Sequence, residues 1–341
     1  MSEARGDGGT VTAPSTVALV AGGATLTVSL LGATPLSWTL PLLGEITDLL
    51  DGYRDPGELY AQAGVRNGVM APFCNRVADA RYTFDGEAHD LLPGADDRTI
   101  YHGLVRREPF ALVSCSQGGR VARAVLRCEA LAGGRATGYP YRVVVEVAYQ
   151  LTPDALEMTV TGTNVGPVAA PFAAGWHPYF RLPRCTVVDR LHLAIPAAVA
   201  IETDEALVPL SGGAAYVEGA GGVWAPLGDR IVDAAFAGLR PDSDGVIRTV
   251  LEDPETGVRL TLSQDRGLVH VFTGDTLERD PRASLALEPV EVMTNAFGRD
   301  DCAASIRLEP GTSRSFSFTT SVTTSAPQPH GGPSRTSART R

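Results

Sequence analysis

The chain has 341 residues, of which 44% are hydrophobic and 20% are charged, and its formal net charge is −10. This composition indicates a globular protein with a large core, and the acidic balance argues against nucleic acid or an anionic membrane as the main partner. The five scattered cysteines include no CxxC pair, which predicts reduced thiols and no zinc framework. Because the N-terminus also lacks a signal-peptide pattern, we expect a cytoplasmic protein.

The N-terminal part of the chain predicts a short tail followed by strands. Residues 1–12 are polar and are expected to be disordered. The apolar region 16–44 is interrupted by glycine, proline, serine and threonine, which favours strands over a membrane span. A short helix is expected in the turn after Leu43.

Two polar segments before residue 105 could bind a ligand. Asn75 and Arg76 precede a predicted hairpin, and Arg76 could present several donors to a ligand or pair with Asp79 or Asp85 at the surface. His102 follows a polar loop, where a histidine is more often exposed than catalytic.

The centre of the chain holds a hairpin and an aromatic motif. Alternating apolar and polar residues predict strands at 141–150 and 155–164. The motif Gly175-Trp176-His177-Pro178-Tyr179-Phe180 follows, and its proline biases the histidine towards an extended backbone. A histidine among aromatic rings suits acid–base chemistry on a sugar. A buried histidine that satisfies its own nitrogens is the structural alternative.

Two further elements precede the last candidate residue. Residues 232–239 predict a second short helix, with Asp233 as its N-cap. Alternation at 245–252 and 257–264 predicts a second hairpin.

Glu288 lies in the apolar segment 284–290. Burying an unpaired carboxylate is expensive, so Glu288 is expected either to pair with an arginine or to act as a general base at a strand end. Glu291 is a weaker candidate for the same role. Pro289 suggests that the strand lies at a sheet edge or ends there.

The C-terminal part predicts one more strand, at 313–320, and then a disordered basic tail at 325–341 that is rich in Pro, Gly, Ser and Arg. Many strands and few helices indicate an all-β fold, a large antiparallel β-sandwich with few short helices. We expect one domain over residues 13–324.

The order and context of these motifs resemble the aldose 1-epimerase (galactose mutarotase) family. The resemblance covers roughly residues 18–320, and the chain looks closer to a less characterised branch of the family than to the best-known galactose enzymes. The matching segments are Asn75-Arg76-Val77, Tyr101-His102-Gly103, the motif around His177, Val232-Asp233-Ala234, Val271-Phe272-Thr273-Gly274 and Leu287-Glu288-Pro289.

The resemblance implies a galactose mutarotase-like supersandwich and an acid–base isomerisation that needs no metal or cofactor. It implies that His177 is the general acid and Glu288 the general base. Around this pair, the residues expected to bind the sugar are Arg76, His102, Asp233, Asn75, Trp176 and Tyr179.

The ordinary pKa values are about 4.3 for Glu and about 6.5 for His. They predict that activity falls at acid pH as Glu288 is protonated and at alkaline pH as His177 loses its proton. A carboxylate nearby is expected to raise the pKa of His177 and favour the imidazolium acid.

The expected activity is the interconversion of α- and β-anomers of a neutral hexose. One alternative is an epimerase of a charged sugar, such as a hexose 6-phosphate or a sulfonated hexose; another is a non-catalytic carbohydrate-binding sandwich. The expected partner is a small sugar, with no nucleic acid or membrane, and the protein is expected to be a monomer or homodimer. A charged sugar would require extra cations, with Arg54, Arg66, Arg106, Arg107 and Arg181 as candidates.

Overall fold

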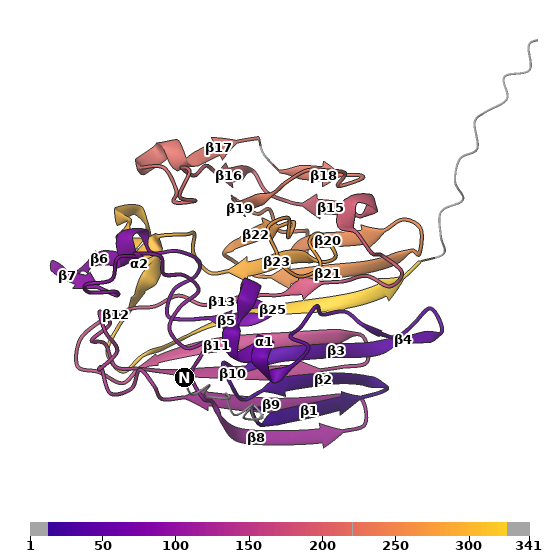
Figure 1. The fold of residues 1–341 in the computed structure, drawn as a ribbon, viewed down its shortest axis with the longest axis horizontal. Coiled ribbons are helices and arrows are strands. Elements are labelled where there is room, and N and C mark those ends of the chain that lie inside the picture. The colour runs from indigo at the N-terminus through magenta and orange to yellow at the C-terminus, as the bar shows by residue number, and fades with distance from the viewer. Residues whose placement is uncertain (1–12, 220, 326–341) are drawn as a thin grey trace, which may run out of the picture.

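The computed structural model describes residues 13–219 and 221–325. The tail expected at 1–12 lies outside the described residues, as does all of the tail expected at 325–341 except Ser325. Strands far outnumber helices in the described chain, the strand pairs are antiparallel, and the strands form two large sheets and three small ones (Figure 1). The structure therefore confirms the all-β prediction.

The largest sheet has nine strands: β8 (Ala111–Gly118), β9 (Val121–Cys128), β10 (Val143–Leu151), β11 (Ala155–Asn164), β15 (His192–Ile195), β18 (Gly222–Trp224), β20 (Ile247–Asp253), β21 (Val258–Gln264) and β25 (Ser313–Thr324). Their order is β18-β15-β20-β21-β25-β11-β10-β9-β8. The last strand, β25, lies between β11 and β21, so it joins the first and second halves of the chain in one sheet (Figure 1).

The second large sheet has eight strands: β5 (Gly68–Met70), β13 (Gly175–His177), β14 (Tyr179–Phe180), β16 (Val199–Ile201), β17 (Tyr216–Glu218), β19 (Asp233–Ala237), β22 (Leu268–Phe272) and β23 (Leu285–Val290). Their order is β17-β16-β19-β22-β23-β13-β5, and β14 also pairs with β23.

Short elements complete the fold. The small sheets contain β1 (Thr16–Ala21), β2 (Ala24–Ser29), β3 (Thr34–Leu42) and β4 (Glu45–Asp48), then β6 (Arg81–Phe84) with β7 (Glu87–Asp90), and β12 (Ala170–Pro171) with β24 (Arg307–Leu308). The α-helices are α1 (Pro56–Ala61) and α2 (Ala303–Ile306). The 3-10 turns are η1 (Ala63–Val65), η2 (Ala78–Ala80), η3 (Val188–Arg190), η4 (Gly212–Ala215), η5 (Ala296–Gly298) and η6 (Asp300–Cys302).

One part of the core lies between the two large sheets, and buried side chains of β1, β2 and β3 add to it. Alternate side chains of a strand point to opposite faces, and in β25 the buried Phe316 and Phe318 alternate with exposed serines. Phe318 stacks on Trp176 of β13, with 5.8 Å between ring centroids. This contact joins the sheets directly and fixes one face of β13 against the core.

The structure confirms both predicted hairpins and the last strand. β10 pairs with β11, and β20 pairs with β21, around the expected turns. The two predicted short helices are wrong. Residues after Leu43 turn into β4, and Asp233 begins β19 and caps no helix. The sequence Val-Asp-Ala-Ala-Phe-Ala has good helix formers, but pairing with β16 and β22 outweighs that weak preference.

Of the two alternatives for Pro289, the edge position is wrong, because β23 lies between β22 and β13. The position at a strand end is confirmed, because β23 ends at Val290. All five cysteines are free thiols, as expected. None of the described helices has the length and apolar character that crossing a membrane requires.

Candidate active site

The candidate site lies on the eight-stranded sheet, where His177 of β13 meets Glu288 of β23. Each lies two residues from the paired Gly175 and Val290. The distance between His177 Nε2 and Glu288 Oε1 is 3.2 Å, and the two side chains are 7% and 1% exposed. We call this pair the dyad. It brings together residues that are more than a hundred positions apart in the sequence.

An interruption of strand pairing surrounds Glu288. On this side of β23, Val290 pairs with Gly175 and Ala286 pairs with Tyr179, and no pair is formed between them. Pro289 falls in this interruption, where its missing N–H leaves no ladder bond unmade. The second carboxyl oxygen of Glu288, Oε2, has no hydrogen-bond partner among the described residues. A buried acceptor of this kind is available to a ligand hydroxyl.

Burial sets the protonation of the dyad. Burial raises the pKa of Glu288 to about 8, against the opposing charge of His270. Burial, and then the charge of His270, lowers the pKa of His177 to about 3. Burial therefore favours the neutral form of each group, in which the dyad carries one titratable proton. This corrects the expectation that the carboxylate is ionised and raises the pKa of His177, because loss of hydration outweighs the attraction between the pair.

Asn75, Arg76 and His102 form one wall next to the dyad. The His102 N–H donates to the Asn75 carbonyl at 2.9 Å, and Arg76 forms a β-bridge with Tyr101. Asn75 and His102 have φ values of 50° and 61°, which are uncommon outside glycine and are typical of positions held by their surroundings. Contacts between the segment of Asn75 and Arg76 and the segment of His102 therefore fix the backbone of this wall.

The side chains of this wall face the dyad. The ring of His102 lies edge-on to His177, with 4.9 Å between centroids, and it is 7% exposed, so the expectation of an exposed histidine is wrong. Burial and the neighbouring His177 hold the pKa of His102 well below its ordinary value. Arg76 donates to Asn75 Oδ1 at 3.1 Å and forms no ion pair among the described residues. Asp79 and Asp85 are thus not its partners, and its guanidinium is free to bind a ligand.

Asp233 and His270 form a second acid–histidine pair beside the dyad. His270 Nε2 lies 2.7 Å from Asp233 Oδ1. Burial alone would raise the pKa of Asp233, but the hydrogen bond and charge of His270 outweigh burial and lower it. His270 was not identified from the sequence. It lies between Val269 and Val271 in a short, mostly apolar strand, and only the pairing of β22 with β19 and β23 reveals its neighbours.

These groups line a cavity of about 520 Å³. Of the eight site residues that the sequence nominated, seven line it: Asn75, Arg76, His102, His177, Tyr179, Asp233 and Glu288. Residues that the sequence did not nominate for it include Tyr53, Glu58, Tyr101, His270, Phe272, Leu277, Glu278 and Arg279. The cavity is large enough for a monosaccharide and offers it both charged groups and aromatic rings.

The expectation that Trp176 binds the sugar needs correction. Its side chain is fully buried, donates from Nε1 to the Asn67 carbonyl at 3.0 Å and does not line the cavity. Alternation along β13 explains this, because His177 faces the cavity and Trp176 the core. Tyr179 does face the cavity. Its ring stacks on His177 with 4.9 Å between centroids, and its hydroxyl donates to the Gly64 carbonyl at 2.9 Å.

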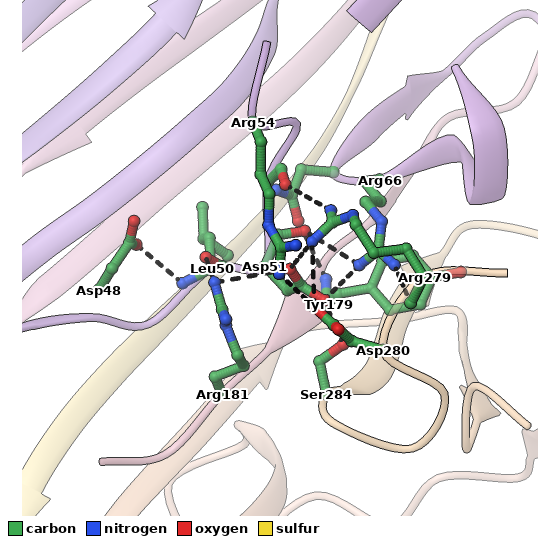
Figure 2. Close-up of polar contacts among 12 residues, drawn as sticks. Asp48, Leu50, Asp51, Arg54, Arg66, Tyr179, Arg181, Arg279, Asp280 and Ser284 are labelled. Carbon is green, nitrogen blue, oxygen red and sulfur yellow. Dashed lines mark hydrogen bonds and ion pairs between the residues drawn. The ribbon is translucent and has the colours of Figure 1, made fainter. Parts of the chain in front are cut away.

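A buried carboxylate, Asp51, anchors the opposite wall. Figure 2 shows Arg66, Arg181 and Arg279 converging on Asp51, with Tyr179 beside them. Arg66 forms a close ion pair with Asp51, and Arg279 Nη1 lies 3.2 Å from Asp51 Oδ1. Burial opposes ionisation of Asp51, but the arginines, Arg66 first, lower its pKa. The carboxylate therefore stays charged and fixes two cavity-lining arginines.

Glu291, the weaker candidate, has a structural role. Its carboxylate pairs with Arg266 and Arg314 at 3.1 and 3.2 Å. It lies outside the residues that line the cavity. An ion pair with arginine, the structural alternative for Glu288, is thus formed by Glu291 instead.

A larger cavity of about 860 Å³ lies between the β6–β7 hairpin and the segment 297–307. Its charged side chains pair with each other, as in Arg81 with Asp90 and Arg307 with Asp85. It contains no buried acid–base pair comparable to the dyad, so volume alone does not make it the candidate site.

Three side chains of the site could in principle chelate an ion. Donor atoms of His102, His177 and Glu288 lie within 4.8 Å of one another. Two of these atoms, His177 Nε2 and Glu288 Oε1, already face each other in the dyad.

The comparisons with known proteins point to a single family. The sequence model of the family described as "Aldose 1-epimerase" matches residues 15–321. An uncharacterised protein of Escherichia coli, YihR, is 24% identical over 231 residues, which are 67% of this chain and 70% of that protein. The aldose 1-epimerase of Escherichia coli is 29% identical over 184 residues, about half of each chain (53% and 51%).

Solved structures share the fold. A GalM/aldose epimerase homologue from C. elegans has a TM-score of 0.75 at 16% identity, over 92% of this chain and 99% of that one. A putative aldose 1-epimerase from Escherichia coli has a TM-score of 0.71 at 23% identity, over 91% and 99%. Galactose 1-epimerase from Lactobacillus acidophilus has a TM-score of 0.72 at 18% identity, over 89% and 92%.

Proposed function

The chain belongs to the aldose 1-epimerase family, and we propose that it interconverts the α- and β-anomers of a neutral aldose. The observation that carries this proposal is the dyad, a carboxyl group and an imidazole 3.2 Å apart and almost completely buried in a sugar-sized cavity. Anomer interconversion requires one group to remove a proton and another to donate one, and the dyad provides both.

In the proposed mechanism, Glu288 accepts the proton of the anomeric hydroxyl while His177 donates a proton to the ring oxygen. The C1–O5 bond breaks and leaves an open-chain aldehyde. Rotation about C1–C2 presents the other carbonyl face, and reversal of both proton transfers closes the ring. One titratable proton in the dyad is enough for each conversion, because Glu288 gains a proton as His177 loses one. The mechanism requires this proton to lie on His177 when the sugar is bound.

The other polar groups are suited to hold the sugar. Arg76 and His102 lie on one wall, and Asp233 lies on β19, two strands from Glu288, so donors and acceptors approach a ligand from different sides. Tyr179 contributes a ring, which is stacked on His177. Positioning of this kind places the anomeric hydroxyl and the ring oxygen within reach of the two members of the dyad.

A neutral substrate fits the charges of the cavity better than an anionic one. Among the five arginines proposed as extra cations, only Arg66 lines the cavity, and Asp51 already neutralises it. Arg279 also lines the cavity, but it pairs with Asp51 and with Glu58. An anionic group on the sugar would have to compete with the buried Asp51 and the partly buried Glu58 for these arginines.

The test compares substrates. Polarimetry of freshly dissolved α-anomers of glucose, galactose and arabinose should show acceleration, and the 6-phosphates and 6-sulfonates of the two hexoses should each show less acceleration than the parent hexose. Acceleration of the anionic sugars alone would support the charged-sugar alternative. Saturable binding without acceleration of any sugar would support a carbohydrate-binding protein.

The protonation of the dyad predicts an unusual pH profile. The one-proton form exists between the pKa of His177, lowered to about 3, and that of Glu288, raised to about 8. We expect kcat/KM to stay level from pH 5 to 7 and to fall above about pH 8, where Glu288 loses the titratable proton of the dyad. A decline centred near the ordinary Glu value, with full activity at pH 9, would contradict this protonation state.

A further inference from the structure

Four titratable side chains form a row across four adjacent strands of the eight-stranded sheet. In strand order β19-β22-β23-β13 they are Asp233, His270, Glu288 and His177. His270 is paired in register with Glu288, and it is hydrogen-bonded to Asp233 on the other side at 2.7 Å. The dyad contact of 3.2 Å completes the row. Acids and histidines therefore alternate along it.

The proposed mechanism leaves His270 without a role. Its side chain is only 9% exposed, so a charge on it is screened little by water. The charged or titratable groups that face it are Asp233 from β19, Glu288 from β23 and His177 from β13, with Arg76 and His102 from the neighbouring wall. The two nearest are carboxyl groups, and these favour an imidazolium.

We propose that His270 is a positioning residue which, held by Asp233, places a positive charge beside Glu288 and so moves the proton of the dyad from Glu288 to His177. This inference rests on the proposed function, because it explains how the dyad reaches the form that the mechanism needs. With His270 charged, the row becomes negative, positive, negative, positive. His270 is paired with Glu288 and is one strand further from His177, so its charge favours a negative Glu288 more than it opposes a positive His177.

The shifts of the individual groups agree in sign. The pKa of His270 is raised although burial alone would lower it, because Glu288 and then Asp233 favour its charged form. In the opposite direction, the charge of His270 acts to lower the pKa of Glu288. The two effects are one interaction seen from its two partners.

The test replaces His270 with Gln, which can still donate to Asp233 but carries no charge, with His270→Asn as a second, shorter variant. Without the cation, both pKa values of the dyad rise. We expect the alkaline limb of the kcat/KM profile to move up by about one pH unit and kcat at pH 7 to fall about 10- to 100-fold, with KM within about threefold. A purely structural His270–Asp233 contact would lower activity without moving the limb, and that result would overturn the proposal.

A second measurement needs neither activity nor a variant at His270. ¹⁵N NMR of the imidazole rings should show His270 more than half protonated at pH 6.5 in the wild-type protein, and Glu288→Gln should lower its pKa. An unchanged titration of His270 in Glu288→Gln, or a neutral ring at pH 6.5 in the wild type, would refute the coupling. Because this readout is independent of turnover, it still decides the question if no sugar is epimerised.

Discussion

Replacement of Glu288 with Gln is expected to lower kcat about 10³-fold, because an amide cannot accept the proton of the anomeric hydroxyl. The change is nearly isosteric, and it leaves the other residues that line the cavity in place. Sugar affinity should therefore change by no more than about threefold. Polarimetry gives the rate, and isothermal titration with the same sugar gives the affinity.

Glu291→Gln is the matched control. The side chain of Glu291 is also only 7% exposed and lies three residues away, but its carboxylate binds Arg266 and Arg314 and does not reach the cavity. We expect its kcat to remain within about threefold of the wild-type value. Equal losses in both variants would mean that general destabilisation, and not loss of the base, lowers the activity of Glu288→Gln.

Replacement of Asp51 with Asn is expected to lower the free energy of unfolding by about 3–5 kcal/mol. Asp51 is fully buried and holds three arginines and the hydroxyl of Ser284, which donates to it at 2.9 Å. Without the carboxylate, the almost fully buried Arg66 has no compensating charge. Urea unfolding followed by circular dichroism measures the loss.

Asp280→Asn serves as the comparison for this prediction. Asp280 pairs with Arg54 and Arg279, but its side chain is 40% exposed, so we expect a change of less than about 1 kcal/mol. Similar losses for the two variants would contradict the anchoring role of Asp51. Since Arg66 and Arg279 line the cavity, Asp51→Asn should also raise KM in the fraction that remains folded.

Local sequence patterns predicted the strands and the dyad well. Alternation identified β10, β11, β20 and β21, because each has one face in the core. His177 and Glu288 stood out because each combines a titratable group with an apolar or aromatic context. Burial of both side chains agrees with that interpretation.

Features that depend on long-range pairing were not predictable. His270 occupies an unremarkable strand, and its importance comes only from the register of β22 with β19 and β23. Asp51 lies in a loop more than two hundred residues from Arg279. Whether Trp176 faces the cavity or the core depends on which face of β13 packs against the other large sheet. The protonation of the dyad was also missed, since burial and not sequence sets it.

The most direct test of the central claim is equilibrium exchange NMR of a 1-¹³C-labelled aldose with a catalytic amount of the wild-type protein. Exchange peaks between the α and β C1 signals should grow in proportion to protein concentration, and the same amount of Glu288→Gln should leave them at the buffer rate. Exchange at the buffer rate with the wild-type protein, for every aldose that it binds, would contradict the assignment of the dyad to anomer interconversion.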